Sequence, residues 1–379
     1  MTKFVLVPDS FKGSISASEV CDIMESSIRK FIPEAEVLKF PISDGGEGSV
    51  KSLLTANGGQ LLACEISGPY LESTSASYGL LDNRTVVIET ASAIGLPLVG
   101  DNKEAKRASS YGVGELISIA LAHKPKKIIV GLGGSCTNDG GTGLAAALGV
   151  NFIDKNGNKF IPKGESLIDI THIDATGMDL RLKKVEIVCM CDVDNLLLGE
   201  TGATYIYAPQ KGATHQDLML MEEGMANLAE LFLKDLNVDV YHLKGGGAAG
   251  GIGAGMYAML NAKLLSGIDT ILESFDADNQ LVNTDLIFTG EGKIDSQSLR
   301  GKAIFGIANM AKRKGIPVIA VVGDVGEGVD PMYSAGVTSI FSINQKAIPF
   351  EEARLRSRTD LGFTMENIIR FLIRNLDTK

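Results

Sequence analysis

The sequence predicts an α/β protein of two α/β domains, in which a parallel-sheet domain built from both chain ends encloses a second, mixed α/β domain. With 379 residues, the chain is longer than a single hydrophobic core usually organises. Both chain ends alternate short apolar runs with amphipathic segments, the order typical of an open parallel sheet. The middle begins with alternating runs that turn tightly, as antiparallel strands do. We place the outer domain at residues 1–60 and 284–379 and the inserted domain at residues 61–283.

The two chain ends repeat the order strand, helix, strand. The first helix is predicted to begin with a capping box of Ser16 and Glu19, and its apolar residues recur three and four positions apart. At the N-terminal end we expect strands at 3–9 and 36–42 and helices at 16–31 and 48–56. At the C-terminal end we expect strands at 284–290, 317–324 and 337–343 and helices at 301–315 and 363–376.

The middle of the chain opens with antiparallel strands at 60–69 and 75–93, which turn at Asp82 and Asn83. The expected elements that follow are helices at 111–124, 143–150 and 216–236 and strands at 126–130 and 184–193. The methionines and leucines of the long helix at 216–236 recur at helical spacing, which favours core packing over a groove for a partner.

The composition excludes several classes of partner. The formal net charge is −10, whereas a nucleic-acid partner needs a basic face. No apolar run approaches the about 18 residues of a membrane span, and the apolar start before Pro8 is too short for a signal peptide. The five cysteines are scattered and odd in number, which is typical of a reduced chain. We therefore expect a cytoplasmic protein without a membrane partner, and a homodimer is one option for its oligomeric state.

The stretch VGLGGSCTNDGGTG, residues 130–143, joins an apolar run to a helix-like run. At such a junction the backbone N–H groups and the helix N-terminus form an anion site, and glycine lets a phosphate approach the backbone. Ser135 and Thr137 add hydroxyl donors, and Asn138 is a candidate helix cap. A tight turn with close helix–strand packing is the other interpretation. The glycine spacing matches neither a Walker loop nor a dinucleotide-binding motif.

Six further loops combine glycine with acidic or lysine side chains. Several follow predicted strands, and ligands bind beyond the carboxyl ends of the strands in open parallel sheets. This combination suits phosphoryl transfer, because a triphosphate needs lysines and Mg²⁺, and Mg²⁺ needs carboxylates. Only four histidines are present, which argues against a Ser-His-Asp hydrolase or a histidine-ligated metal centre. The loops span residues 8–14, 43–49, 191–203, 208–214, 244–255 and 289–303.

The motifs in these loops closely resemble those of the bacterial glycerate kinase family, in the family's order. They are PDSFKGSISA, PISDGGEGS, GLGGSCTNDGGTG, CDVDN, APQKGA, GAAGGIGAG and TGEGKIDSQSLRGKA. The resemblance implies ATP-dependent phosphorylation of D-glycerate, usually at the 2-hydroxyl, to give 2-phosphoglycerate and ADP. It also implies a flavodoxin-like domain from both chain ends, with a second α/β domain inserted. The family often has alanine where this chain has Cys136, which makes the loop a candidate for alkylation.

The roles within the loops follow from side-chain chemistry. Lysines neutralise phosphate or the acceptor's carboxylate, an arginine binds a carboxylate in a fork, and carboxylates bind Mg²⁺ or accept the hydroxyl proton. The predicted catalytic residues are Asp192, as the base, with Lys12, Asp295 and Lys302. The predicted ATP-binding residues are Gly133, Gly134, Ser135, Thr137, Asn138, Lys211, Gly250 and Gly251. The predicted substrate-binding residues are Ser10, Lys12, Asp44, Gly45, Gly46, Glu47 and Arg300, and the predicted Mg²⁺ ligands are Asp44, Asp192, Glu291 and Asp295.

Three alternatives stay open. A kinase or phosphatase of a related small hydroxy acid, or a glycerate kinase that acts at the 3-hydroxyl, would share these loops. A catalytically inactive nucleotide-binding regulator would be expected to lack the charged motif residues, which this chain retains. A dinucleotide oxidoreductase would need a G-x-G-x-x-G motif within a βαβ unit, and the chain has none in that arrangement.

Overall fold

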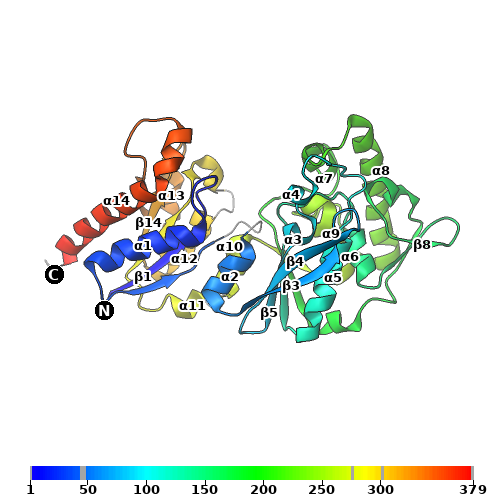
Figure 1. Ribbon diagram of the computed structural model, residues 1–379, viewed down its shortest axis with the longest axis horizontal. Helices are drawn as coiled ribbons and strands as arrows, with labels where there is room; N and C mark the ends of the chain where they lie inside the picture. The colour runs from blue at the N-terminus through cyan, green and yellow to red at the C-terminus, as the bar shows by residue number, and fades with distance from the viewer. Residues whose placement is uncertain (1, 43–47, 275–276, 300–302, 377–379) are drawn as a thin grey trace. The chain divides into compact units, whose positions relative to one another are not determined.

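The computed structural model describes residues 2–42, 48–274, 277–299 and 303–376 (Figure 1). The chain divides into two compact units, each described here by itself. The outer unit comprises Met1–Asp44, Lys51–Asn57 and Gly267–Lys379, and the inserted unit comprises Gly45–Val50 and Gly58–Ser266. The second boundary thus lies at 266/267 rather than at the expected 283/284, because helix α10 (Gly267–Ser274) contacts helix α12 (Ala303–Lys314) of the outer unit.

The outer unit is built on a five-stranded sheet whose strands come from both chain ends. The order across the sheet is β16-β14-β12-β1-β2, and every neighbouring pair is parallel. From β2, this is the 2-1-3-4-5 order of flavodoxin-like sheets, in which the strand order reverses between the first and third strands. The predicted fold class is confirmed. The strands are β1 (Lys3–Pro8), β2 (Glu36–Lys39), β12 (Leu286–Gly290), β14 (Val318–Val322) and β16 (Val337–Ser342).

Helices cover both faces of this sheet (Figure 1). Val321 of β14 packs in a core cluster with α1 and α14, whereas its neighbour Val322 packs in a cluster with α12 and α13. This follows from strand geometry, since successive side chains point to opposite faces. The helices not yet given are α1 (Ala17–Phe31), α2 (Ser49–Asn57), α11 (Ala277–Gln280), α13 (Asp330–Ala335) and α14 (Phe350–Leu376), with the 3-10 helix η5 (Ser296–Leu299).

Helix α1 begins at its predicted cap. The Ser16 hydroxyl accepts a hydrogen bond from the Glu19 N–H at 3.4 Å. The Glu19 carboxylate is bound by Arg358 of α14, through Nε at 2.6 Å and Nη2 at 3.1 Å. The reciprocal half of the expected capping box is therefore replaced by a contact with the last helix, which runs beside α1 (Figure 1).

The inserted unit contains a six-stranded mixed sheet in the order β11-β10-β6-β5-β4-β3. The pairs β3–β4 and β4–β5 are antiparallel, as expected from the alternating sequence, and the remaining pairs are parallel. A small antiparallel sheet, β8-β7-β9, was not expected. The strands are β3 (Gln60–Ser67), β4 (Ser73–Leu80), β5 (Thr85–Glu89), β6 (Lys127–Gly131), β7 (Asn151–Ile153), β8 (Lys159–Phe160), β9 (His172–Asp174), β10 (Glu186–Met190) and β11 (Lys263–Leu265).

The helices of the inserted unit pack on the sheet through one core cluster. Ile88 of β5 and Val130 of β6 join it with residues of α5, α6, α8 and α9. Met225 of α8 is fully buried there, as the helical spacing predicted. The helices are α3 (Thr90–Ile94), α4 (Leu96–Val99), α5 (Tyr111–Ala120), α6 (Thr142–Ala147), α7 (Ala203–Tyr207), α8 (His215–Leu236) and α9 (Ala248–Leu260). The 3-10 helices are η1 (Leu121–His123), η2 (Gly164–Asp169), η3 (Leu180–Lys184) and η4 (Pro209–Lys211).

All five cysteines are free thiols. Cys189 is buried in β10, and Cys191, just beyond the strand, is half-buried. Among the residues described, no helix combines the length and the apolar composition that a bilayer span requires.

Candidate active site

The glycine loop leaves the carboxyl end of β6 and leads into α6. Its first half forms a short antiparallel pairing with the segment that joins α3 to α4. The Leu96 N–H donates to the Gly134 carbonyl at 2.8 Å, and the Cys136 N–H donates to the Ile94 carbonyl at 2.8 Å. This pairing fixes the backbone of the loop from one side.

The glycines of the predicted ATP site have two different purposes. Gly133 is half-buried and Gly134 is exposed, with φ 78°, so the backbone here is open to a ligand. Gly250 and Gly251 are buried in the first turn of α9. Gly250 has φ 66°, and a Cβ added to it would lie 2.1 Å from the Thr137 carbonyl oxygen. Close packing therefore accounts for the glycine at position 250, whereas Gly134 lies at an exposed corner of the loop.

Lys211 holds a buried ammonium group against this loop. Its side chain is 3% exposed. Nζ donates to the Thr137 carbonyl at 2.7 Å and to the Ser135 hydroxyl at 3.2 Å. Burial lowers the pKa of Lys211 to about 8, while Cys136 and Asp139 act in the opposite direction. A cation held among backbone groups of a glycine loop suits an anionic ligand.

Asp139, which is absent from the predicted site, anchors the second half of the loop. Its buried carboxylate accepts hydrogen bonds from the Ser110 N–H at 2.7 Å and the Ser110 hydroxyl at 2.8 Å. It also accepts from the N–H groups of Gly141 at 3.2 Å and Gly143 at 3.3 Å. These bonds tie the loop to the starts of α5 and α6. An acid directly before two glycines and a helix was the signal that could have identified it.

Asn138 does not make the capping bond that its position suggested. Its Nδ2 donates instead to the Thr204 hydroxyl at 3.3 Å. Asn138 and Thr137 are both fully buried, and the Oδ1 of Asn138 and the Oγ1 of Thr137 have no hydrogen-bond partner among the described residues. The capping function belongs to Asp139, so the prediction for Asn138 as the cap is wrong.

The thiol of Cys136 lies beside the Lys211 site. Burial raises the pKa of Cys136 to about 12, and Lys211 lowers it by a smaller amount. The reactive thiolate is therefore scarce near neutral pH. The alkylation expected from the sequence does not follow from this environment.

Asp192 lies on a loop that leaves the sheet at the same edge as the glycine loop. β10 and β6 are parallel neighbours with Met190 opposite Gly131, and the Leu132 N–H donates to the Met190 carbonyl at 3.3 Å. Asp192 lies two residues beyond this point and is exposed. Asn195 holds the loop that carries Asp192. The main-chain carbonyl of Asn195 accepts a hydrogen bond from the Gly247 N–H. Its side-chain Oδ1 accepts from the Tyr207 hydroxyl, and its Nδ2 donates to the Thr201 carbonyl.

In the outer unit, two candidate loops meet at the point where the strand order reverses. β1 and β12 are parallel neighbours with Pro8 opposite Gly290. A Cβ on Gly292 would lie 3.3 Å from the Lys12 backbone nitrogen, so the loops that follow the two strands are in contact. They carry Ser10 and the exposed Lys12 on one side and Glu291 and Asp295 on the other. This is the topological position at which doubly wound sheets bind ligands.

Glu291 and Asp295 are bridged by one serine. The Ser298 hydroxyl donates to the buried Glu291 carboxylate at 2.6 Å, and the Asp295 N–H donates to the same hydroxyl at 3.3 Å. The remaining predicted site residues lie outside the described residues: Asp44, Gly45, Gly46, Glu47, Arg300 and Lys302.

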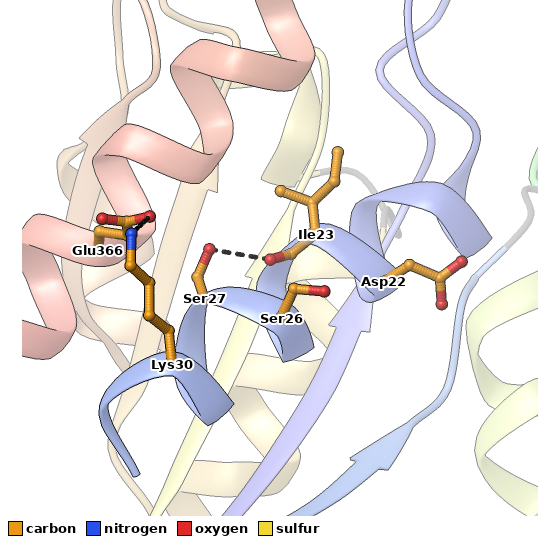
Figure 2. Close-up of a pocket in the computed structure, with 6 residues that line it drawn as sticks. All are labelled: Asp22, Ile23, Ser26, Ser27, Lys30 and Glu366. Carbon is orange, nitrogen blue, oxygen red and sulfur yellow. Dashed lines mark hydrogen bonds and ion pairs between the residues drawn. The ribbon is translucent and has the colours of Figure 1, made fainter. Parts of the chain in front are cut away.

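A surface cavity of about 330 Å³ lies on the outer unit, away from all of these loops (Figure 2). It is lined by residues of α1 and by Glu366 of α14, which pairs with Lys30 at 2.7 Å. The Ser27 hydroxyl donates to the Ile23 carbonyl at 2.9 Å. None of the predicted site residues lines it, and the side chains of Ser27, Lys30 and Glu366 already make these local contacts.

Comparison with known proteins identifies the family. The model of the glycerate kinase family matches residues 4–373. The chain belongs to the glycerate kinase family. It is a phosphotransferase, and membership of this family implies the use of ATP.

Relatives named as glycerate kinases match the chain over nearly its whole length. "Glycerate kinase" of Bacillus subtilis (strain 168) is 40% identical over 353 residues, which are 93% of this chain and 92% of the relative. "Glycerate 2-kinase" of Escherichia coli (strain K12) is 40% identical over 353 residues, 93% of each chain. The crystal structure of a candidate glycerate kinase 2 from Salmonella typhimurium LT2 matches with a TM-score of 0.89 at 38% identity, over 99% of both chains.

Proposed function

We propose that this member of the glycerate kinase family transfers the terminal phosphoryl group of ATP to the 2-hydroxyl of D-glycerate, giving 2-phosphoglycerate and ADP. The observation that carries the proposal is the loop corner of half-buried Gly133 and exposed Gly134 next to the buried Lys211 ammonium, in a chain of this family. The position of transfer is supported by the relative named glycerate 2-kinase. The scattered, unpaired cysteines support a location in the cytoplasm.

The glycine loop would bind the phosphates of ATP. At Gly133 and Gly134 no side chain stands between a ligand and the backbone, and the positive φ of Gly134 is accessible to glycine at no steric cost. The Ser135 hydroxyl, which accepts from Lys211, keeps its own proton to donate. An exposed backbone with a buried cation behind it therefore offers donors and charge to an anion without a conformational change.

The acceptor chemistry would use groups at the carboxyl edges of the two sheets. Asp192 would accept the proton of the reacting hydroxyl, because it is an exposed carboxylate at the end of β10. Lys12 would neutralise developing charge or the carboxylate of glycerate. In phosphoryl transfer, most of the rate comes from positioning and electrostatic stabilisation, so these groups are expected to act mainly by holding charge in place.

Mg²⁺ fits the oxygen donors of the site. Among the described residues, no group of three or more acidic, histidine or cysteine side chains forms a ready-made metal cage. In kinase sites, Mg²⁺ is usually bound by one or two carboxylates together with waters and substrate phosphates. Asp192 of the inserted unit and Asp295 of the outer unit are each a candidate protein ligand, and the ion would neutralise charge on the phosphoryl group. Glu291, whose carboxylate already accepts from Ser298, is a further candidate.

The test is ADP release with ATP and Mg²⁺ on D-glycerate, L-glycerate, glycolate, D-lactate and no acceptor. We expect turnover with D-glycerate, and ¹H and ³¹P NMR of the product should place the phosphate on carbon 2. Phosphate on carbon 3 would establish a 3-kinase. Turnover with another acid alone would overturn glycerate as the substrate.

The roles are tested by Lys12→Ala and Asp192→Asn. Each is expected to lower kcat/KM by about a thousandfold, the size of a lost transition-state contact. Matched controls are Lys155→Ala and Asp154→Asn, at the exposed turn between β7 and β8. Folded variants at Lys12 or Asp192 with activity equal to these controls would show that the assigned residue has no catalytic role.

A further inference from the structure

Lys211 is fixed by its backbone before its side chain reaches the loop. Its N–H donates to the Ala208 carbonyl at 3.0 Å, and its carbonyl accepts from the Ala105 N–H at 3.1 Å. Gly212, which follows, has φ 89°, and a Cβ there would lie 2.1 Å from the Lys103 carbonyl oxygen. The main chain of Lys211 is therefore fixed, and its ammonium group is held by hydrogen bonds to Ser135 and Thr137.

Lys211 and Asp139 hold different parts of the five-residue segment 135–139. Two of the three N–H donors of Lys211 bind Ser135 and Thr137, in the first part of the segment. At its end, burial raises the pKa of Asp139, and the hydrogen bonds from Ser110, Gly141 and Gly143 act in the opposite direction. Every described partner of the carboxylate is a donor, which favours the ionised form. Neither charge reaches solvent.

The two charges act on each other without contact. Among the described residues, no ion pair joins Lys211 to a carboxylate, yet Asp139 favours the charged form of Lys211 through space. Buried charges are costly when alone, and removing one of a pair leaves the other uncompensated. Thus each charge stabilises the other across the loop, with Cys136, Thr137 and Asn138 between them.

We infer that Lys211 and Asp139 are positioning residues, a buried charge pair that holds residues 135–139 so that Gly133 and Gly134 present their backbone to the phosphates of ATP. The inference rests on the proposed function of the glycine loop. It differs from the simpler assignment of Lys211 as a direct phosphate ligand, because a direct ligand would act independently of Asp139. Asp139 has no role in the reaction under that assignment.

A double-mutant cycle separates the two possibilities. Lys211→Met, Asp139→Asn and the double variant are compared with the wild type by the Kd for ATP, measured by calorimetry without acceptor, and by KM and kcat. A positioning pair predicts that each single change weakens ATP binding by about tenfold and that the double change weakens it far less than a hundredfold. Asp154→Asn is the control, since this exposed carboxylate also accepts backbone N–H groups, from Asn156 and Asn158, at a distant turn.

The pH profile is a second readout. Because the pKa of Lys211 lies at about 8, ATP should bind more weakly to the wild type as the pH rises through this value, and Lys211→Met should lose the dependence. Cys136 and Asp139 are the titratable groups that act on Lys211, and the thiol stays neutral in this range. On the adjoining segment, Lys106 is paired with Asp217 at 2.8 Å.

If Asp139→Asn does not fold, Ser110→Ala is used in its place. This change removes only one of the four hydrogen bonds to the Asp139 carboxylate, and it is also expected to weaken ATP binding. Two results would overturn the inference and leave the loop as the ATP site. The first is that the changes in the Kd for ATP of the two single variants multiply in the double variant. The second is that Lys211→Met weakens ATP binding while the variants at Asp139 and Ser110 bind ATP as the wild type does. A wild type that binds no ATP would overturn the proposed function, and the inference with it.

Discussion

Replacing Gly250 with alanine tests whether the glycine loop is held by packing against α9. An added Cβ would lie 2.1 Å from the Thr137 carbonyl oxygen and 2.7 Å from the Asn138 Cα, and both are backbone atoms that cannot rotate away. The positive φ of 66° adds about 1–2 kcal/mol of strain, and the overlap adds about 1–3 kcal/mol. We therefore expect a loss of about 4 kcal/mol, which lowers Tm by about 10 °C for a unit of this size.

Gly157→Ala is the matched control. Gly157 also has a positive φ, 82°, and lies in the same unit, but a Cβ there would meet no atom within 4 Å. Only the strain of about 1–2 kcal/mol remains, so Tm should fall by about 2–8 °C. Thermal unfolding of the two variants, followed by circular dichroism, gives the comparison. Equal shifts would refute the argument that α9 packs against the loop through Gly250.

The same argument predicts a different result at Gly134. There the nearest atom to an added Cβ is the Ala91 Cβ at 3.2 Å, and φ is 78°. We expect a stability loss somewhat larger than that of Gly157→Ala, because the Ala91 Cβ must shift slightly, but smaller than that of Gly250→Ala, because no backbone atom is in the way. The Kd for ATP should rise by at least about tenfold, since the side chain would stand where the phosphate approaches the backbone. Unchanged ATP binding would show that this corner does not contact the nucleotide.

Three further predictions concern single side chains. The pKa of Lys211 falls on folding from 10.5 to about 8, so burying its charge destabilises the folded state fully below pH 8, and this cost is relieved as the pH rises from 8 to 10.5. From pH 7 to 9, the unfolding free energy of the wild type should therefore rise by about 1 kcal/mol relative to that of Lys211→Met. Parallel plots of unfolding free energy against pH for the two proteins would contradict the shift. Cys136, with its pKa raised to about 12, should resist iodoacetamide in the folded protein and react after unfolding, as read by mass spectrometry, and rapid labelling of the native protein would contradict its burial. Ser298→Ala removes the donor to Glu291, so if Glu291 binds Mg²⁺ the half-saturating Mg²⁺ concentration should rise by about tenfold or more, whereas an unchanged titration would exclude that role.

Strands β12 and β14 could be predicted from the sequence because each is a short apolar run that is buried on both faces. The start of α14 could not. The helix begins at Phe350, thirteen residues before the apolar pattern at 363, and its first part is stabilised by polar contacts. Arg356 pairs with Asp360 one turn later at 3.0 Å, and such pairs leave no hydrophobic period to detect.

In the candidate site, the loops could be predicted from the sequence, but the burial of their side chains could not. A lysine in a glycine-rich loop is expected to be exposed, yet Lys211 is buried because η4 and Gly212 direct its chain inward. The position of Asp139 before two glycines and a helix could have indicated a cap, but its bonds to Ser110, 29 residues away in the sequence, depend on the fold. Of the two interpretations of the glycines, close packing is confirmed at Gly250, and the phosphate site at Gly134 stays a prediction.

The topology explains why the inserted unit needs such a loop. In the outer sheet the strand order reverses between β1 and β12, and a reversal opens a crevice in which loops diverge to receive a ligand. The parallel strands of the inserted sheet, β5, β6, β10 and β11, instead follow one another in sequence order. Among them no reversal separates the loops, so the anion site that we propose there would be formed by the backbone itself. The glycines at the open corner and the charge buried behind it would provide the ligand contacts that the strand order does not.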